Sequence, residues 1–330
     1  MKLDSPLAAL LPGQVTIRDV SLRDGLQMLR QPVATAEKLA WVRSAYGAGL
    51  REMEIGAFVP PRSMPQLADT AEVLSFAKTL SGLTTHVLVP NLRGAERAMA
   101  EEADAMVLPL SASHAHSLAN MRRTPDEVVA EIGYIRAARD AAGARTRLEV
   151  GISTAFGCTI QGLVDPREVV RLVQGALDAG ADSVSLADTV GHANPAGVSR
   201  LLEATMNVAG ERLNAVHFHD TRGLGLANCL AALQAGITHF DACIGGLGGC
   251  PHAPGASGNV VTEDLAYMFE SMGIATGLDV DSLLAVRAQI AMLLPGERLY
   301  GSVWRTRRSG AARSGSSLAL ATNSNSVLTS

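Results

Sequence analysis

An α/β barrel of eight parallel strands, each followed by a helix, is the fold that the sequence predicts. Short β-branched and apolar runs alternate with longer amphipathic segments from near residue 15 to near residue 272, which is the pattern of repeated βα units. The runs number eight, and eight strands close a barrel. An open doubly wound sheet would require a glycine-rich phosphate turn after its first strand, and this sequence has none. The predicted class is therefore α/β, a TIM (β/α)8 barrel.

The expected strands are apolar enough to be buried on both faces, as the strands of a parallel sheet are. In chain order they occupy residues 15–21, 51–58, 85–90, 105–110, 147–153, 183–188, 214–220 and 238–244. Segments with helical period lie between them. The clearest are residues 125–139 and 166–179, because each begins with a proline at the first helical position and has acidic residues in its first turn.

The two ends of the chain are predicted to lie outside the barrel. Residues 1–14 form an N-terminal extension, and residues 15–307 form the catalytic domain, in which a C-terminal helix over 279–294 covers the barrel. Residues 308–330 are rich in Ser, Ala and Asn without periodicity. We therefore expect a low-complexity, disordered tail there.

Composition narrows the class of protein. Hydrophobic residues make up 47% of the chain and charged residues 18%, which suits a soluble globular protein with a large aliphatic core. A formal net charge of -4 without a basic cluster argues against nucleic acid as a partner. Because the sequence shows neither a signal-peptide pattern nor a membrane span, we expect no membrane association and a cytoplasmic location. The four cysteines have no CxxC spacing, so neither a disulfide framework nor a zinc cage is expected.

Polar residues follow several predicted strands at their carboxyl ends, where TIM barrels place catalytic groups. Taken from strand one to the glycine-rich loop 245–259, they are Arg23, Asp24, Gln27, Glu54, Asp188, Thr189, His217, His219, Cys250 and Asn259.

His217 and His219 are the strongest indication of a metal site. Side chains alternate along a strand, so this pair projects to one side and can share an ion at the barrel mouth. With an Asp and an Asn as oxygen ligands and no thiolate, such a site suits Mg²⁺ or Mn²⁺. The spacing alone proves little, because His114 and His116 have it too.

Each remaining candidate has a structural interpretation beside the functional one. Arg23 and Asp24 could be a surface ion pair, or Arg23 could neutralise a developing enolate oxygen. Glu54 could be an ordinary inward charge, and Asp188 could cap the next helix. Cys250 could be a small apolar filler, or a thiol that a closing loop delivers as a proton donor.

The segments VSLRDGLQ, LADTVG, HFHD and GGLGGCPHAPGASGNVVTEDLAYM resemble the hydroxymethylglutaryl-CoA lyase family over residues 15–294. The glycine-rich loop is the most specific of them, because Arg-Asp-Gly would equally suit related condensing enzymes and aldolases. The resemblance implies metal ligands at Asp24, His217, His219 and Asn259. It also implies catalytic residues at Arg23, Glu54, Asp188, His217 and Cys250.

The reaction that the resemblance implies is a retro-Claisen cleavage of a 3-hydroxy-3-methylglutaryl-CoA-like thioester to acetyl-CoA and acetoacetate. A divalent cation would bind the substrate's hydroxyl group and lower its pKa. Arg23 would then stabilise the thioester enolate, and Cys250 would protonate its carbon. The base that takes the hydroxyl proton stays open between Asp188, His217 and a water at the metal. In the cell, the resemblance implies a place in leucine degradation and ketone-body metabolism.

The sequence departs from the family where substrate should bind. Met28 and Leu29 replace the usual Asn-Glu, and His114 and His116 replace an acidic and an aromatic residue. We hypothesise that the apolar pair admits a substituent larger than methyl. The expected substrate-binding residues are Gln27, Met28, Leu29, His114, His116 and Thr189.

Two other functions remain open at this point. One is a Claisen or aldol enzyme of the same barrel group that forms the carbon-carbon bond instead. The other is a metal-binding barrel that has lost catalysis. The expected partners are an acyl-CoA substrate and further copies of the chain in a homo-oligomer, a dimer or a tetramer.

Overall fold

A computed structural model describes residues 11–249 and 258–307 of the chain. The predicted tail, the first ten residues of the predicted N-terminal extension, and Cys250 lie outside the described residues.

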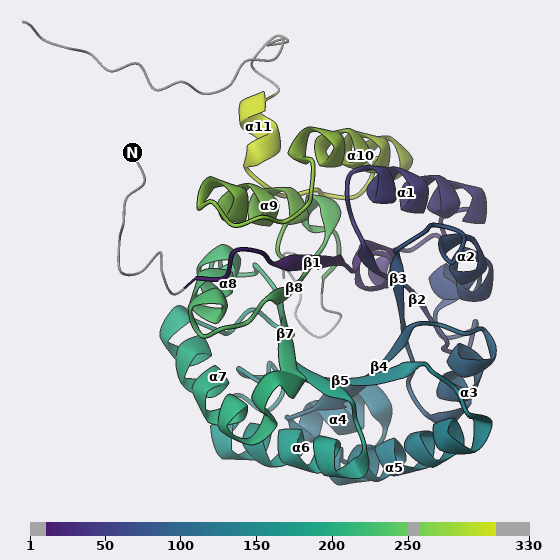
Figure 1. The fold of residues 1–330 in the computed structure, drawn as a ribbon, viewed down its shortest axis with the longest axis vertical. Coiled ribbons are helices and arrows are strands. Elements are labelled where there is room, and N and C mark those ends of the chain that lie inside the picture. The colour runs from purple at the N-terminus through teal and green to yellow at the C-terminus, as the bar shows by residue number, and fades with distance from the viewer. Residues whose placement is uncertain (1–10, 250–257, 308–330) are drawn as a thin grey trace, which may run out of the picture.

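Eight parallel strands close into a barrel in chain order (Figure 1). The barrel closes where the first strand pairs with the last, with Thr16 opposite His239 and Asp19 opposite Ala242. The TIM-barrel class and all eight predicted strands are confirmed. The strands are β1 (Thr16–Asp19), β2 (Glu52–Ala57), β3 (Thr84–Leu88), β4 (Ala105–Ser111), β5 (Arg147–Ser153), β6 (Ser183–Asp188), β7 (Leu213–Phe218) and β8 (His239–Ala242).

Helices surround the barrel (Figure 1). The two prolines that the sequence singled out begin α5 and α6, and the C-terminal helix is α10. A reciprocal capping box between Thr124 and Glu127 fixes the start of α5. The helices are α1 (Thr35–Gly47), α2 (Thr70–Ala77), α3 (Leu92–Ala100), α4 (His114–Met121), α5 (Pro125–Ala142), α6 (Pro166–Ala179), α7 (Pro195–Ala209), α8 (Gly225–Gln234), α9 (Thr262–Ser271), α10 (Val280–Leu293) and α11 (Val303–Arg307).

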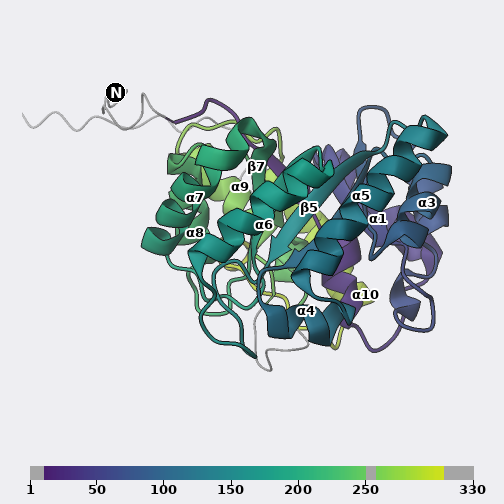
Figure 2. The same ribbon diagram turned by 90° about the horizontal axis from the view of Figure 1, so that it is seen from below.

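Helix α4 belongs to the end of the barrel that carries the candidate site. It follows β4 directly, and Figure 2 shows it below α5 and α6, at one end of the barrel. The sequence did not indicate this helix separately from the loop after strand four. The helix is relevant to the site because its residues His116 and Asn120 line the cavity at the mouth of the barrel.

Strand one is shorter than predicted. The sequence predicts a strand to residue 21, but β1 ends at Asp19 and a π-helical turn, η2 (Ser21–Gly25), follows. The turn is held from a distance, because the backbone N–H of Ile244 donates to Ser21 Oγ at 2.8 Å. The residue preferences of the local sequence cannot predict this contact. Single π-helical turns often occur at functional sites, and this one carries Asp24.

Strand seven is also shorter than predicted. It ends at Phe218, and His219 forms an isolated bridge with Asn259 instead. The glycine-rich segment that carries Asn259 packs very closely at this point. A Cβ atom on Gly258 would lie only 2.0 Å from the carbonyl oxygen of Gly246. Only glycine therefore fits where the segment returns to the barrel.

The described cysteines, Cys158, Cys229 and Cys243, are free and buried. Within the described residues, no helix has the length and apolar character needed to cross a bilayer.

Candidate metal centre

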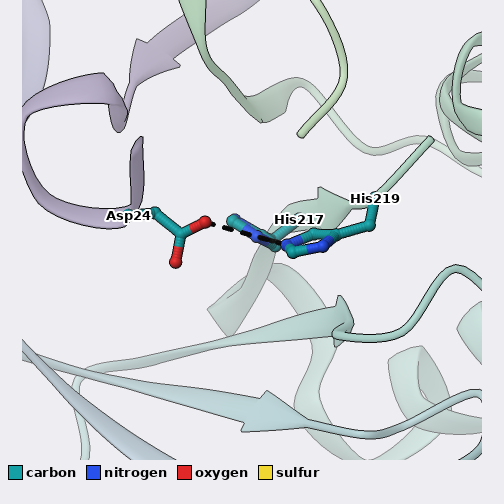
Figure 3. Close-up of side chains that lie close together, drawn as sticks. All are labelled: Asp24, His217 and His219. Atoms are coloured by element: carbon teal, nitrogen blue, oxygen red, sulfur yellow. Dashed lines mark hydrogen bonds and ion pairs between the residues drawn. The ribbon is translucent and has the colours of Figure 1, made fainter. Parts of the chain in front are cut away.

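Asp24, His217 and His219 meet at the mouth of the barrel (Figure 3). One ligand atom from each lies within 4.8 Å of the other two. His219 Nε2 is 3.1 Å from His217 Nε2 and 3.7 Å from Asp24 Oδ2. All three residues are buried. Two imidazole nitrogens and a carboxylate that face one another in this way could hold one metal ion.

The two histidines reach this position because of strand periodicity. His217 is on β7 and His219 follows two residues later, so both side chains point inward. His217 Nδ1 lies 3.1 Å from Asp241 Oδ2 on β8. The carboxylate acts as the acceptor, so Nδ1 carries the proton and the lone pair of Nε2 faces Asp24 and His219.

The surroundings keep two groups of the triad, Asp24 and His219, in states that can bind a cation. Burial raises the pKa of Asp24, but Arg23 and the two histidines outweigh burial and bring that pKa below its usual value. Burial and the charge of His217 lower the pKa of His219 to about 4. Asp24 is therefore ionised and His219 neutral near pH 7, which are the forms that bind metals.

Asn259, the fourth predicted ligand, lies beside the triad. Its Nδ2 donates to Asp24 Oδ2 at 2.6 Å and to the carbonyl oxygen of Leu247 at 3.2 Å. Its Oδ1 is buried and makes no hydrogen bond within the described residues. A buried amide oxygen without a donor fits an oxygen ligand of a hard cation.

Arg23 and Glu54 adjoin the triad. Arg23 Nε donates to Glu54 Oε2 at 2.6 Å, and Arg23 Nη1 donates to Asp24 Oδ1 at 2.6 Å. Gln27 Nε2 also donates to Asp24 Oδ1, at 2.7 Å. Burial raises the pKa of Glu54, although Arg23 opposes the shift. Arg23 itself lines the cavity, and its side-chain hydrogen bonds to described residues use Nε and Nη1, which leaves Nη2 for a ligand.

A cavity of about 840 Å³ opens over these groups. Arg23, Asp24, Glu54, His217 and His219 line one side of it. Apolar side chains complete the lining: Met28 follows the π-helical turn, and Val59, Met64, Leu88, Val107 and Pro109 come from the segments between β2 and the end of β4.

The predicted substrate-binding residues divide into two groups. Gln27, Met28, His116 and Thr189 line the cavity. Leu29 is 5% exposed, packs in the hydrophobic core and does not line the cavity. His114 is exposed on α4, also away from the cavity lining.

Asp188 takes part in folding the loop after β6. Its Oδ1 accepts from the backbone N–H of His192 and its Oδ2 from that of Ala193, both at 2.8 Å. The side chain is buried and does not line the cavity, although Thr189 next to it does. Burial raises the pKa of Asp188.

A polar network on the cavity floor, which the sequence did not predict, surrounds Arg18. Arg18 donates to Asp241 through Nε at 2.7 Å and to Glu149 through Nη1 at 2.7 Å. Ser185 Oγ donates to Glu149 Oε1 at 2.7 Å, and Arg18 Nη1 contacts His86 Nδ1 at 3.0 Å. The signal was present in the strands, because a charged residue in the middle of an apolar parallel strand must point inward to a partner.

Comparisons with known proteins agree with this geometry. A profile of the HMGL-like family matches residues 14–290. The chain is 40% identical over 274 residues to hydroxymethylglutaryl-CoA lyase of Bacillus subtilis, covering 83% of this chain and 91% of that protein. It is 38% identical over 286 residues to the 3-hydroxy-3-isohexenylglutaryl-CoA/hydroxymethylglutaryl-CoA lyase of Pseudomonas aeruginosa, covering 86% and 94%. Among solved structures, an HMG-CoA lyase of Acinetobacter baumannii in complex with coenzyme A and 3-methylmalate superposes with a TM-score of 0.85 at 36% identity, covering 94% of this chain and 99% of that one.

Proposed function

The chain belongs to the HMGL-like family, and from that premise we propose that it cleaves a 3-hydroxy-3-methylglutaryl-CoA-like thioester to acetyl-CoA and acetoacetate. It is accordingly a carbon-carbon lyase. The observation that carries the proposal is the meeting of His217, His219 and Asp24 within 4.8 Å beside Arg23 and a large cavity.

The ligand set fits Mg²⁺ or Mn²⁺. Asp24, His217 and His219 would hold the cation, and Asn259 would offer the Oδ1 that makes no hydrogen bond within the described residues. When bound, the cation supplies Lewis acidity that lowers the pKa of the substrate's hydroxyl group.

Arg23 has the position and the donors to stabilise the enolate of the thioester. Glu54 and Asp24 hold its Nε and Nη1, so the guanidinium is fixed while Nη2 remains open to the cavity. A donor fixed in advance at a site of developing charge stabilises the transition state without reorganisation. Glu54 therefore acts mainly by positioning Arg23.

The cleavage needs a base for the hydroxyl proton and a proton donor for the enolate carbon. His217 lines the cavity, whereas both oxygens of Asp188 accept hydrogen bonds from its own loop. This difference favours His217, or a water beside it, over Asp188 as the base that takes the hydroxyl proton. Cys250, which would protonate the enolate carbon, lies outside the described residues.

A bulkier substrate is a second candidate. Met28 is 41% exposed and lines the cavity beside the apolar side chains of the β2–β4 region. A branched alkyl group at the substrate's third carbon would find apolar contacts there. The relative in Pseudomonas aeruginosa is named for such a substrate as well as for the methyl compound. Leu29, which packs in the core, would act only by supporting Met28.

The direct test measures acetyl-CoA release from 3-hydroxy-3-methylglutaryl-CoA with Mg²⁺ or Mn²⁺ and again with EDTA. We expect release that requires the metal. Analogues with longer substituents separate the two substrates through kcat/KM, and efficient turnover of the methyl compound alone would count against the bulkier one. Consumption of acetyl-CoA with a 2-oxo acid would indicate the condensing enzyme, and no reaction under any metal would indicate an inactive barrel.

The cellular setting follows from the same proposal. We expect a cytoplasmic enzyme of leucine degradation and ketone-body metabolism that assembles as a dimer or a tetramer. Sedimentation of the purified chain measures the assembly directly.

A further inference from the structure

The proposed function requires the cavity to receive an acyl thioester of coenzyme A, which carries several phosphate charges far from the reacting bond. Four arginines line the cavity: Arg18, Arg23, Arg122 and Arg123. Which of them can bind phosphate depends on the acids that each already contacts.

The two arginines deep in the cavity are committed to acids. Arg18 makes two hydrogen bonds with Asp241 and two with Glu149. Arg23 is paired with Asp24 and Glu54. A phosphate group would have to compete with carboxylates at both of these residues.

The two arginines at the end of α4 differ from the deep pair. Arg122 is exposed at the cavity mouth and has no ion pair with any described residue. Arg123 is paired with Glu131 at 2.9 Å, and its side chain remains 36% exposed. We call these two residues the Arg122–Arg123 corner. It is a part of the cavity lining whose positive charge is available to bind an anion.

The backbone of this corner is held in place from both sides. Arg122 has φ 55° and ψ 30°, the left-handed conformation that costs a non-glycine residue about 1 kcal/mol or more. Its N–H donates to the carbonyl oxygen of Leu118 at 3.1 Å, and Ser117 Oγ donates to the carbonyl oxygen of Arg123 at 2.7 Å. The capping box at Thr124 begins α5 immediately afterwards. An arginine kept in a strained conformation at a cavity mouth points to a role for its side chain.

The corner continues into a face of α4 that points to the cavity. His116 and Asn120 are one helical turn apart, and both line the cavity. His116 is buried and contacts Ser111 Oγ at 3.0 Å. Polar groups thus run from the exposed corner inward along α4, on the side of the cavity away from β7 and β8.

We propose that the Arg122–Arg123 corner binds the phosphate groups of coenzyme A. The nucleotide then lies over the end of α4, and the thioester extends across the cavity toward Arg23. Arginine suits this role because its planar group donates two parallel hydrogen bonds to phosphate. A substrate carboxylate could offer the same chemistry, so the test separates the two anions.

The experiment measures binding of coenzyme A and of pantetheine, which lacks the phosphates, by calorimetry. Arg122→Met and Arg122→Gly should each weaken coenzyme A binding about tenfold, since a hydrogen bond to a charged group is lost, and should leave pantetheine binding unchanged. Arg122→Gly also relieves the backbone strain, so its melting temperature should not fall. Arg136→Met is the matched control, because Arg136 is an exposed arginine of α5 that does not line the cavity and whose one ion pair within the described residues is with Asp140, at 3.6 Å.

Kinetics assign the anion. The variants should lower kcat/KM for the coenzyme A ester of 3-hydroxy-3-methylglutarate and not for its pantetheine ester. Equal losses on both esters would assign the corner to the acyl carboxylate and overturn the proposal, as would unchanged coenzyme A binding. If the wild type binds coenzyme A at this corner but cleaves neither ester, the proposed function fails while this inference stands.

Discussion

Replacing Asp241 by asparagine tests how the barrel floor controls the metal centre. Asp241 Oδ1 accepts from Arg18 Nε at 2.7 Å, while Oδ2 accepts from Arg18 Nη2 and His217 Nδ1, both at 3.1 Å. An asparagine has only one oxygen. If its NH₂ group faces His217, the imidazole must accept at Nδ1 and carry its proton on Nε2, the atom that faces Asp24 and His219. If the NH₂ group faces Arg18 instead, two donors oppose each other in a buried site.

The expected size of the effect follows from the lost hydrogen bond. A hydrogen bond to a charged group is worth about 1.5–3 kcal/mol, and each 1.4 kcal/mol corresponds to about tenfold in an affinity. Loss of an outer partner of a ligating histidine typically costs about 10- to 100-fold in metal affinity. We therefore expect Asp241→Asn to raise the Kd for Mn²⁺ by about 10- to 100-fold, measured by calorimetry on metal-free protein.

Asp69→Asn is the matched control. Asp69 accepts from the buried Lys38 Nζ at 2.6 Å, and neither residue lines the cavity. This variant should lose thermal stability and keep its Mn²⁺ affinity. A folded Asp241→Asn protein with a Kd within about twofold of the wild type would refute the reasoning, because Asp241 would then serve only the stability of the barrel.

Four further predictions concern the ligand His219, Cys250, the buried Glu263 of α9 and the glycine-rich segment. His219→Ala should lose Mn²⁺ binding and nearly all turnover, whereas Cys250→Ala or Cys250→Ser should lose turnover with Mn²⁺ affinity intact; full activity in the Cys250 variants would exclude the proton-donor role. Burial raises the pKa of Glu263 from 4.5 to about 7, so the wild type should lose roughly 3 kcal/mol of stability as pH rises through that range. Glu263→Gln should lose less stability over the same range. Guanidinium unfolding at pH 5 and pH 8 measures the loss in each protein, and an equal loss in the wild type and the variant would contradict this. Gly258→Ala should lower kcat and Mn²⁺ affinity because its Cβ would meet the oxygen of Gly246 at 2.0 Å, while Gly133→Ala, with nothing within 4 Å, should be neutral or stabilising; unimpaired Gly258→Ala protein would show that the segment can shift.

The barrel could be predicted from the sequence because its signal is local and repeated. Each βα unit has its own apolar run, turn residues and helix start, and Pro125 and Pro166 mark two helix starts that the structure reproduces. The inward pair of His217 and His219 at the mouth followed from the same logic, since side chains alternate along a strand and the strands of a closed parallel barrel end at one mouth. The family resemblance added Asp24 and Asn259 as ligands, which no periodicity indicated.

The parts that could not be predicted depend on contacts between distant segments. Arg18 is 131 residues from Glu149 and 223 residues from Asp241, so no local pattern links them. The π-helical turn that carries Asp24 depends in the same way on Ile244. Inward positions do recur at every second residue along β5, where Glu149, Gly151 and Ser153 all line the cavity. A search for polar residues at such positions would have found the floor network, although not its pairing.

Charge balance links this network to the metal site. The cavity interior contains four carboxylates, which belong to Asp24, Glu54, Glu149 and Asp241, and two guanidinium groups, which belong to Arg18 and Arg23. If both histidines take the neutral form that binds a metal and all four acids are ionised, these groups leave two negative charges without a counter-charge among them. A buried excess of this kind is costly unless a cation offsets it. The raised pKa of Glu54 reflects this cost, because burial and the charge of Asp241 both favour its neutral form. A divalent cation beside Asp24 and the histidines would offset the excess charge without protonation of any acid. The floor network would thus favour a cation at this mouth of the barrel, because Arg18 neutralises only one of the two acids it holds.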